Sequence, residues 1–183
     1  MTASTPAQTS TTRSDGPESD AGWERRVTDL WAALDSHSEQ EFTALMDELA
    51  AELPPDHPDA VFERGAALDS TGHSDLAVPL YERALALGLG GERRRRAVIQ
   101  MASSLRNLGR SEESVALLTA ERETGSDHLD DAVSVFLALA LTDVGREREA
   151  VSITVTALAR HLPRYQRSSA AYARLLVGDG EEA

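Results

Sequence analysis

The chain has 183 residues, of which 41% are hydrophobic and none is cysteine, and 31 acidic against 18 basic side chains give a net charge of −13. This length allows a hydrophobic core in one or two domains, and the lack of cysteine excludes disulfides, thiolate nucleophiles and cysteine-ligated metals. No segment approaches the roughly 20 consecutive apolar residues of a membrane-spanning helix. Because a strongly negative protein repels polyanions and anionic lipid surfaces, we expect neither nucleic acid nor a membrane as partner.

Residues 1–20 contain nine Ser and Thr residues, two prolines and almost no apolar side chain. Such a segment buries too little surface to offset the entropy lost on ordering, so we predict a disordered tail. The same residues lack the basic and apolar regions of a secretory signal, and we therefore expect a cytoplasmic protein.

From Trp23 onward, apolar residues recur at three- and four-residue spacing, and no segment alternates as a half-buried strand does. The pattern predicts an all-α protein. Short breaks separate the helices; for example, Pro54 and Pro55 end one helix, and Pro58 suits the first turn of the next. The predicted helices span 22–35, 39–53, 58–70, 75–87, 92–107, 112–123, 128–143, 147–161 and 164–177.

Three glycines, Gly72, Gly109 and Gly145, mark an internal repeat, because they lie 37 and then 36 residues apart. Each has a leucine four positions before it and a small residue five positions after it. A glycine just past a helix can adopt the left-handed conformation that ends the helix, and we expect Ser74 or Ser111 to cap the helix that follows. Each unit is therefore predicted to be a helical hairpin that buries its apolar face only against a neighbour.

The repeat resembles that of the tetratricopeptide repeat (TPR) family, whose pattern is Trp-x2-Leu-Gly-x2-Tyr followed by Ala-x3-Phe and Ala. The matching residues are Gly65, Leu68, Ala77, Tyr81 and Ala84 in the first unit, Met101, Ala102, Leu105, Ser114 and Leu118 in the second, and Leu137, Ala138, Leu141, Ala150 and Ala157 in the third. The Trp position instead holds Val61, Val98 and Ser134. The long period is similar to that of small bacterial TPR proteins with extended hairpins.

The resemblance implies a TPR-like α-solenoid of stacked antiparallel helical hairpins. We expect four parts: the tail 1–20, an N-terminal helical pair 21–57 that is a degenerate repeat or a cap, three hairpins 58–162, and a C-terminal capping helix with a short tail 163–183. Stacked repeats need a terminal cap with a polar outer face for solubility. The last helix is expected to be amphipathic and to suit this role, with Tyr165, Tyr172, Leu175 and Leu176 beside Arg164, Arg167 and Arg174.

In TPR arrays the first helix of each hairpin lines a concave binding surface, and the resemblance implies the same here. The candidate partner-binding residues are Phe62, Asp69, Arg96, Gln100, Ser103, Arg106, Asn107, Phe136 and Asp143. The members on helix 92–107 form one polar face whose guanidinium groups suit a carboxylate, similar to the carboxylate clamps of some TPR domains. The alternative is a solvated face whose arginines pair with Asp69 and Asp143.

The run Arg93 to Arg96 is the one candidate for a basic patch, but consecutive helical residues point about 100° apart and form no stripe. We expect these arginines to pair with Glu63, Glu82 and Glu92. The acid pairs Glu112/Glu113 and Glu121/Glu123 are expected on the solvated side of the second helix, where no cleft separates their pKa values for catalysis.

The five histidines stand at different helix boundaries without the i, i+4 spacing of helical zinc sites, and no catalytic motif is present. We therefore assign no catalytic, metal or cofactor residue, and expect no enzyme. The sequence predicts an adaptor that binds a protein or peptide.

Two alternatives stay open: a small regulatory or catalytic helical domain with an interhelical pocket, and a self-associating structural protein. Self-association would use Trp23 and Trp31, which share one face of the first helix and are the residue type most common at interface hot spots. Otherwise these tryptophans pack a capping helix onto the end of the array.

Overall fold

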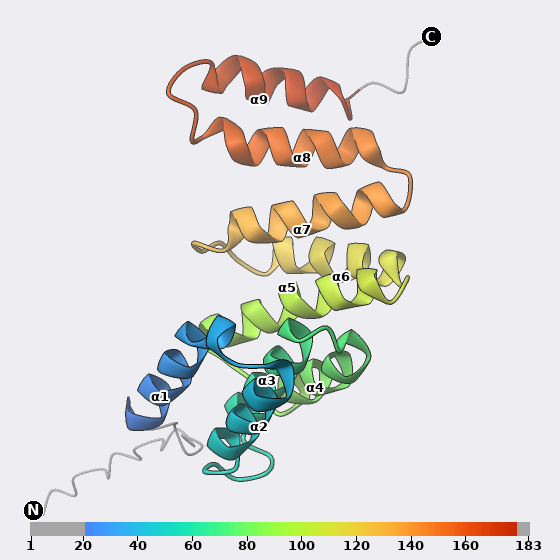
Figure 1. Ribbon diagram of the computed structural model, residues 1–183. Coiled ribbons are helices and arrows are strands. Elements are labelled where there is room, and N and C mark those ends of the chain that lie inside the picture. Colours follow the sequence, from blue (N-terminus) through green and yellow to red (C-terminus); the bar gives the residue numbers. More distant parts are fainter. Residues whose placement is uncertain (1–20, 179–183) are drawn as a thin grey trace, which may run out of the picture.

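The computed structural model describes residues 21–178, and within them the chain forms nine α-helices, one 3₁₀ helix and no strand (Figure 1). The helices are α1 (Ala21–Ala32), α2 (Glu39–Ala50), α3 (Pro58–Ser70), α4 (Ser74–Ala86), α5 (Gly91–Asn107), α6 (Ser111–Glu123), α7 (Asp130–Asp143), α8 (Glu147–Ala159) and α9 (Gln166–Leu175), with the 3₁₀ helix at Leu34–Ser36. The predicted all-α class is confirmed, and every predicted helix boundary lies within three residues of the observed one. The predicted disordered tail lies outside the described residues.

The three repeat glycines end α3, α5 and α7 in the same way. Gly72, Gly109 and Gly145 have φ values of 86°, 74° and 75°, a region that a residue with a Cβ atom adopts only with strain. The N–H of the residue after each glycine donates to the carbonyl of the leucine four positions before the glycine, at 2.8, 2.8 and 2.9 Å. This bond satisfies a carbonyl that the helix end would leave free, so the chain turns without exposing an unpaired acceptor.

The predicted serine caps are wrong. Ser74 and Ser111 are the first residues of α4 and α6, and neither helix has a side-chain cap. Instead, Asn107 donates to the Ser74 hydroxyl at 3.4 Å, and Ser111 donates to the Asp143 carboxylate at 3.3 Å. Each serine therefore links its helix to the following hairpin.

The helices α3–α8 form three stacked antiparallel hairpins, and Figure 1 shows them rising from α1 and α2 at one end to α9 at the other. Helix α5 packs against both α3 and α4, and α7 packs against both α5 and α6. The first helix of one hairpin thus fills the groove between the two helices of the preceding hairpin. Helix α9 departs from this rule, because it packs on α8 and has at most marginal contact with α7.

Both tryptophans attach α1 to the rest of the array. The indole N–H of Trp23, which is 1% exposed, donates to the Leu49 carbonyl at 2.8 Å, and that of Trp31 donates to Glu63 at 2.8 Å. The Trp31 ring also lies 5.1 Å from that of Phe42. These contacts match the packing interpretation, and they leave the buried Trp23 unavailable as a surface for self-association.

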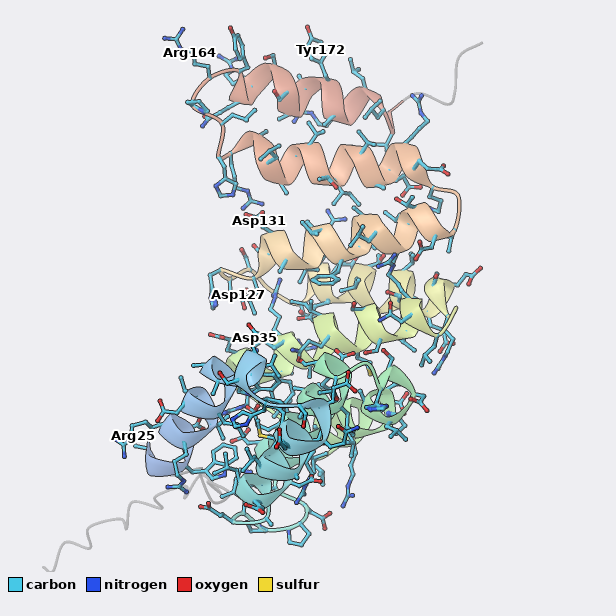
Figure 2. All side chains as sticks on the ribbon, viewed as in Figure 1. Arg25, Asp35, Asp127, Asp131, Arg164 and Tyr172 are labelled. Atoms are coloured by element: carbon cyan, nitrogen blue, oxygen red, sulfur yellow. The ribbon has the colours of Figure 1, made fainter. Side chains whose placement is uncertain are left out.

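The expected polar outer face of the last helix is wrong in part. Tyr172 and Leu175 of α9 are 70% and 62% exposed. Figure 2 shows Tyr172 and Arg164 pointing away from the rest of the molecule. The C-terminal end of the array therefore presents apolar as well as basic side chains to solvent.

We expect the variant Gly109→Ala to destabilise the protein by about 1–2 kcal/mol, because alanine pays a steric cost in the left-handed conformation. A Cβ atom at Gly109 would meet no atom within 4 Å, so the loss would be conformational. Gly109→Asn is the matched control, since asparagine tolerates this region better than alanine. Urea denaturation should give free energies of unfolding that decrease in the order wild type, Gly109→Asn, Gly109→Ala. An alanine variant as stable as wild type would contradict the role of the bend.

Candidate protein-binding surface

Arg93, near the start of α5, joins three elements. Its guanidinium group donates to Glu24 of α1 at 2.7 and 2.8 Å and to Glu63 of α3 at 2.9 Å, and it lies 5.5 Å from the centre of the Trp23 ring. Burial acts to lower the pKa of Arg93, but the hydrogen bonds to Glu24 and Glu63 outweigh it and hold the pKa above its usual value. Glu63 is 1% exposed, and its carboxylate accepts hydrogen bonds from Arg93 and from the Trp31 indole.

The next three arginines point in different directions, as their spacing predicts. Arg94 donates to Glu121 of α6 at 2.7 Å, Arg95 donates to Asp130 of α7 at 2.7 Å, and Arg96 lies over the Phe62 ring. The predicted acid pairing is confirmed for Glu63 only. Glu92 lies instead 3.4 Å from His128, and no ion pair among the described residues involves Glu82.

The expectation that Glu121 is solvated is also wrong. Its side chain is 2% exposed, and its carboxylate accepts from Arg94 while lying 3.9 Å from Arg95. The two buried glutamates, Glu63 of α3 and Glu121 of α6, therefore each pair with an arginine of α5.

The polar face predicted on α5 holds neighbouring hairpins together. Arg106 donates to Asp143 of α7 at 2.6 and 3.2 Å, so its guanidinium group already has a carboxylate of the same chain. Asp69 of α3 accepts from Ser104 of α5 and, at 3.3 Å, from Tyr81. Burial, and then the Asp69 carboxylate, raises the pKa of the Tyr81 hydroxyl above its ordinary value of 10.0.

The remaining predicted residues do not converge on one site. Phe62 is fully buried beneath Arg96 and offers no accessible surface. Gln100, Ser103 and Phe136 are half-buried, and the buried Oε1 of Gln100 has no hydrogen-bond partner in residues 21–178. Partner binding by this face of α5 stays a prediction.

A groove of about 320 Å³ lies between α7 and α8, which the sequence interpretation did not identify. Its lining includes Val135 and Leu139 of α7 and Val151 and Val155 of α8, and no lining side chain is charged. Val135, Leu139 and Val151 are 43%, 43% and 49% exposed.

The threonines of the same groove, Thr142 and Thr154, donate to backbone carbonyls one helical turn earlier. Their hydroxyls are therefore satisfied within the helix. The surface is consequently apolar over its whole length.

The repeat explains why this groove exists. Relative to its glycine, Val135 is equivalent to Phe62 and Ile99, which are 0% and 6% exposed. Val151 is likewise equivalent to Val78 and Val115, which are 3% and 8% exposed. In the first two hairpins α5 and α7 cover these positions, whereas α9 leaves them open in the third.

One signal in the sequence could have located this groove. Apart from Ser134, segment 132–141 is apolar on all sides, whereas a helix with one solvated face shows a single apolar stripe. Its inward face requires Val133 and Leu137, which are buried, and the surplus residues Val135 and Leu139 stand on the other side.

Comparison with known proteins agrees with this architecture. The sequence pattern of the family described as "Tetratrico peptide repeat" matches residues 58–176. The chain belongs to the tetratricopeptide repeat family. The matched region contains all three hairpins and α9, so the predicted TPR solenoid is confirmed.

Three solved structures share this TPR fold. Two are Podospora anserina "putative kinesin light chain nearly identical TPR-like repeats". The first is 20% identical to this chain, with a TM-score of 0.64 and coverage of 86% of this chain and 87% of that one. The second carries a single substitution and is 19% identical, with a TM-score of 0.63 and coverage of 88% of this chain and 90% of that one. The third is a mutant of MamA, with 20% identity, a TM-score of 0.54, and coverage of 76% of this chain and 79% of MamA. No curated protein matches the sequence significantly.

Residues 21–178 show neither a metal-binding cluster nor a membrane-spanning helix. No three His, Asp or Glu side chains there are grouped so that they could hold a metal ion. In the same range, no helix combines the length and the apolar character needed to cross a bilayer.

We expect Arg93→Ala to lower the free energy of unfolding by about 3 kcal/mol, because the buried Glu63 carboxylate would lose its ionic partner. Arg25→Ala is the control: Arg25 is exposed and makes no ion pair with a described residue, so its loss should cost less than about 0.5 kcal/mol. Urea denaturation at neutral pH measures both values. Equal stability of the two variants would contradict the anchoring role of Arg93.

The hydrogen bonds from Arg106 hold the pKa of Asp143 below its usual value, and Ser111 adds to this effect. A carboxyl with a lowered pKa in the folded state stabilises the fold above its unfolded pKa of about 3.9 and loses that contribution as the pH falls. Wild type should therefore be more stable than Asp143→Asn at pH 7, and the difference should shrink as the pH falls toward 3.

Urea denaturation across that pH range measures the difference. In an Arg106→Gln background, the effect of Asp143→Asn should be smaller at pH 7. A stability difference that does not change with pH would show that the Arg106–Asp143 pair contributes nothing through charge.

Proposed function

We propose that this protein is an interaction module that binds an amphipathic helical segment of a protein partner in the groove between α7 and α8. The supporting observation is that positions buried in the first two hairpins are 43–49% exposed in the third. Contiguous exposed apolar surface in a soluble protein typically marks an interaction site.

The molecule itself indicates the kind of occupant. The equivalent groove between α3 and α4 receives α5, whose Ala97, Met101 and Leu105 belong to the same buried cluster as Phe62 and Val78. The groove between α5 and α6 receives α7 in the same manner. A third helix with apolar residues at three- and four-residue spacing matches the shape and chemistry of the open groove.

The rival functions have less support in the described residues. Catalysis requires convergent titratable groups, whereas the lining of this groove is uncharged. Peptide-carboxylate binding by Arg106 would require it to leave Asp143, to which it donates twice. Docking of a helix into the groove requires no existing bond to break.

A synthetic α5 peptide, residues 91–107, tests this proposal, because α5 fills the equivalent groove of the first hairpin. We expect the full chain to bind this peptide and not a scrambled peptide of the same composition, as measured by fluorescence anisotropy. Leu139→Asp should weaken binding at least tenfold, because it places an unpaired charge in an apolar contact.

Leu76→Asp is the matched control, since Leu76 is a 52% exposed leucine outside the groove. Affinity capture from the native host with wild type and Leu139→Asp then identifies the natural partner. Equal binding of the scrambled peptide, or equal loss with Leu76→Asp, would contradict docking in the groove.

A further inference from the structure

A polar cleft lies on a different side of α8 from the apolar groove. It consists of two adjoining hollows of about 370 and 200 Å³ that share Arg122 of α6, Ser134 of α7 and Arg160, which follows α8. The larger hollow lies at the lower end of the range for small-molecule sites, ~300–1,000 Å³. It also reaches Ser152 and Thr156 of α8.

A change at one repeat position accompanies this cleft. Ser134 is equivalent to Val61 and Val98, which are 1% and 3% exposed in the first two hairpins. These valines fill the position with apolar volume, whereas the third hairpin has a smaller, half-buried serine that lines the cleft. At this position the third hairpin therefore has a hydroxyl group, whereas the first two hairpins have a buried valine.

Several donors in the cleft have no partner among residues 21–178. The guanidinium group of Arg122 forms neither a hydrogen bond nor an ion pair there, and the hydroxyls of Ser134, Ser152 and Thr156 form no hydrogen bond. Ser152 is only 6% exposed, so its unused hydroxyl faces little besides the cleft. Arg122 and Thr156 are exposed and Ser134 is half-buried, so this set of donors around one hollow is accessible to an acceptor from another molecule.

The acids beside the cleft are already neutralised. Glu149 accepts from Arg146 at 2.7 and 2.8 Å, and Asp130 accepts from Arg95 at 2.7 Å. Asp131 lies 2.8 Å from Arg160, whose remaining N–H groups are free for a further acceptor. Among the charged side chains that line the cleft within residues 21–178, Arg122 is the one without an opposite charge as partner.

We propose that this cleft binds a phosphoryl group, held by Arg122 and Arg160 and by the hydroxyls of Ser134, Ser152 and Thr156. A phosphoryl group has three strong acceptor oxygens and a charge of about −1.5 to −2, which suits donors from three helices better than the two coplanar oxygens of a carboxylate. The group is either a free phosphate compound or a phosphorylated side chain of a protein.

Titration of the full chain with inorganic phosphate, against chloride at equal ionic strength, tests the site by amide chemical shifts. We expect shifts centred on Ser134 and Ser152. Arg122→Gln should weaken phosphate binding at least tenfold. The control Arg25→Gln removes the same charge from a side chain that Figure 2 shows pointing away from α1, and it should change affinity less than twofold.

Ser134→Val separates binding from folding, because it restores the residue of the first two hairpins. This variant should unfold at the same or a higher temperature than wild type while losing phosphate binding. Leu139→Asp, in the apolar groove, should leave phosphate binding unchanged, so the two sites are tested independently.

A phosphoserine peptide and its unphosphorylated form distinguish the two sources. Tighter binding of the phosphopeptide than of phosphate identifies a protein ligand, and equal binding identifies a small one. No phosphate-dependent shift, or equal weakening by Arg25→Gln, would overturn the proposal.

Discussion

Ion pairs with several neighbouring helices fix the position of helix α5, and the stacking of the array depends on these pairs. Glu63 and Glu121 are 1% and 2% exposed, and a buried carboxylate is tolerated only with a charged partner. Arg93 and Arg94 are those partners, so α5 cannot rotate or slide without leaving a buried charge unpaired. Such pairs add little net stability over apolar packing, but they specify one arrangement of the helices around α5.

The same helix joins two of the hydrophobic clusters. Met101 and Leu105 pack with α3 and α4, whereas Ile99 and Ala102 pack with α6 and α7. In a stacked-repeat protein each unit is stabilised mainly by its neighbours. Helix α5 belongs to both clusters, so it couples the packing of the first hairpin to the packing of the later ones. The ion pairs at the start of α5 therefore set the direction in which the later hairpins stack.

A polar contact between hairpins that occurs at one repeat position in the first two hairpins is missing in the third. Three positions before its glycine, the first hairpin has Asp69, which binds Ser104 of the next, and the second has Arg106, which binds Asp143. The equivalent Thr142 of the third hairpin bonds within its own helix. Without a polar link from α7, α9 packs mainly on α8, and the groove between α7 and α8 stays open.

The glycine period and the apolar spacing were sufficient to predict the helices and their stacking, because both are properties of local sequence. The partners of polar residues were harder to predict. Glu121 occupies a position where the family pattern expects an apolar or small residue, and only the approach of Arg94, twenty-seven residues earlier on the other helix of the same hairpin, explains its burial. Similarly, nothing local to Ser74 shows that Asn107, thirty-three residues later, is its partner rather than the backbone of α4.

The apolar groove could be predicted from the sequence only in part, because its exposure depends on where α9 packs. Ser134 and Val135 are neighbours that replace Val61–Phe62 and Val98–Ile99, pairs in which every side chain is buried. In the third hairpin the first member of the pair lines the polar cleft and the second lines the apolar groove. Because repeat stability is a sum of local terms, a hairpin at the end of the array can give up packing at these two positions without unfolding the hairpins behind it. The end of the array is therefore where packing residues are most readily replaced by residues that contact another molecule.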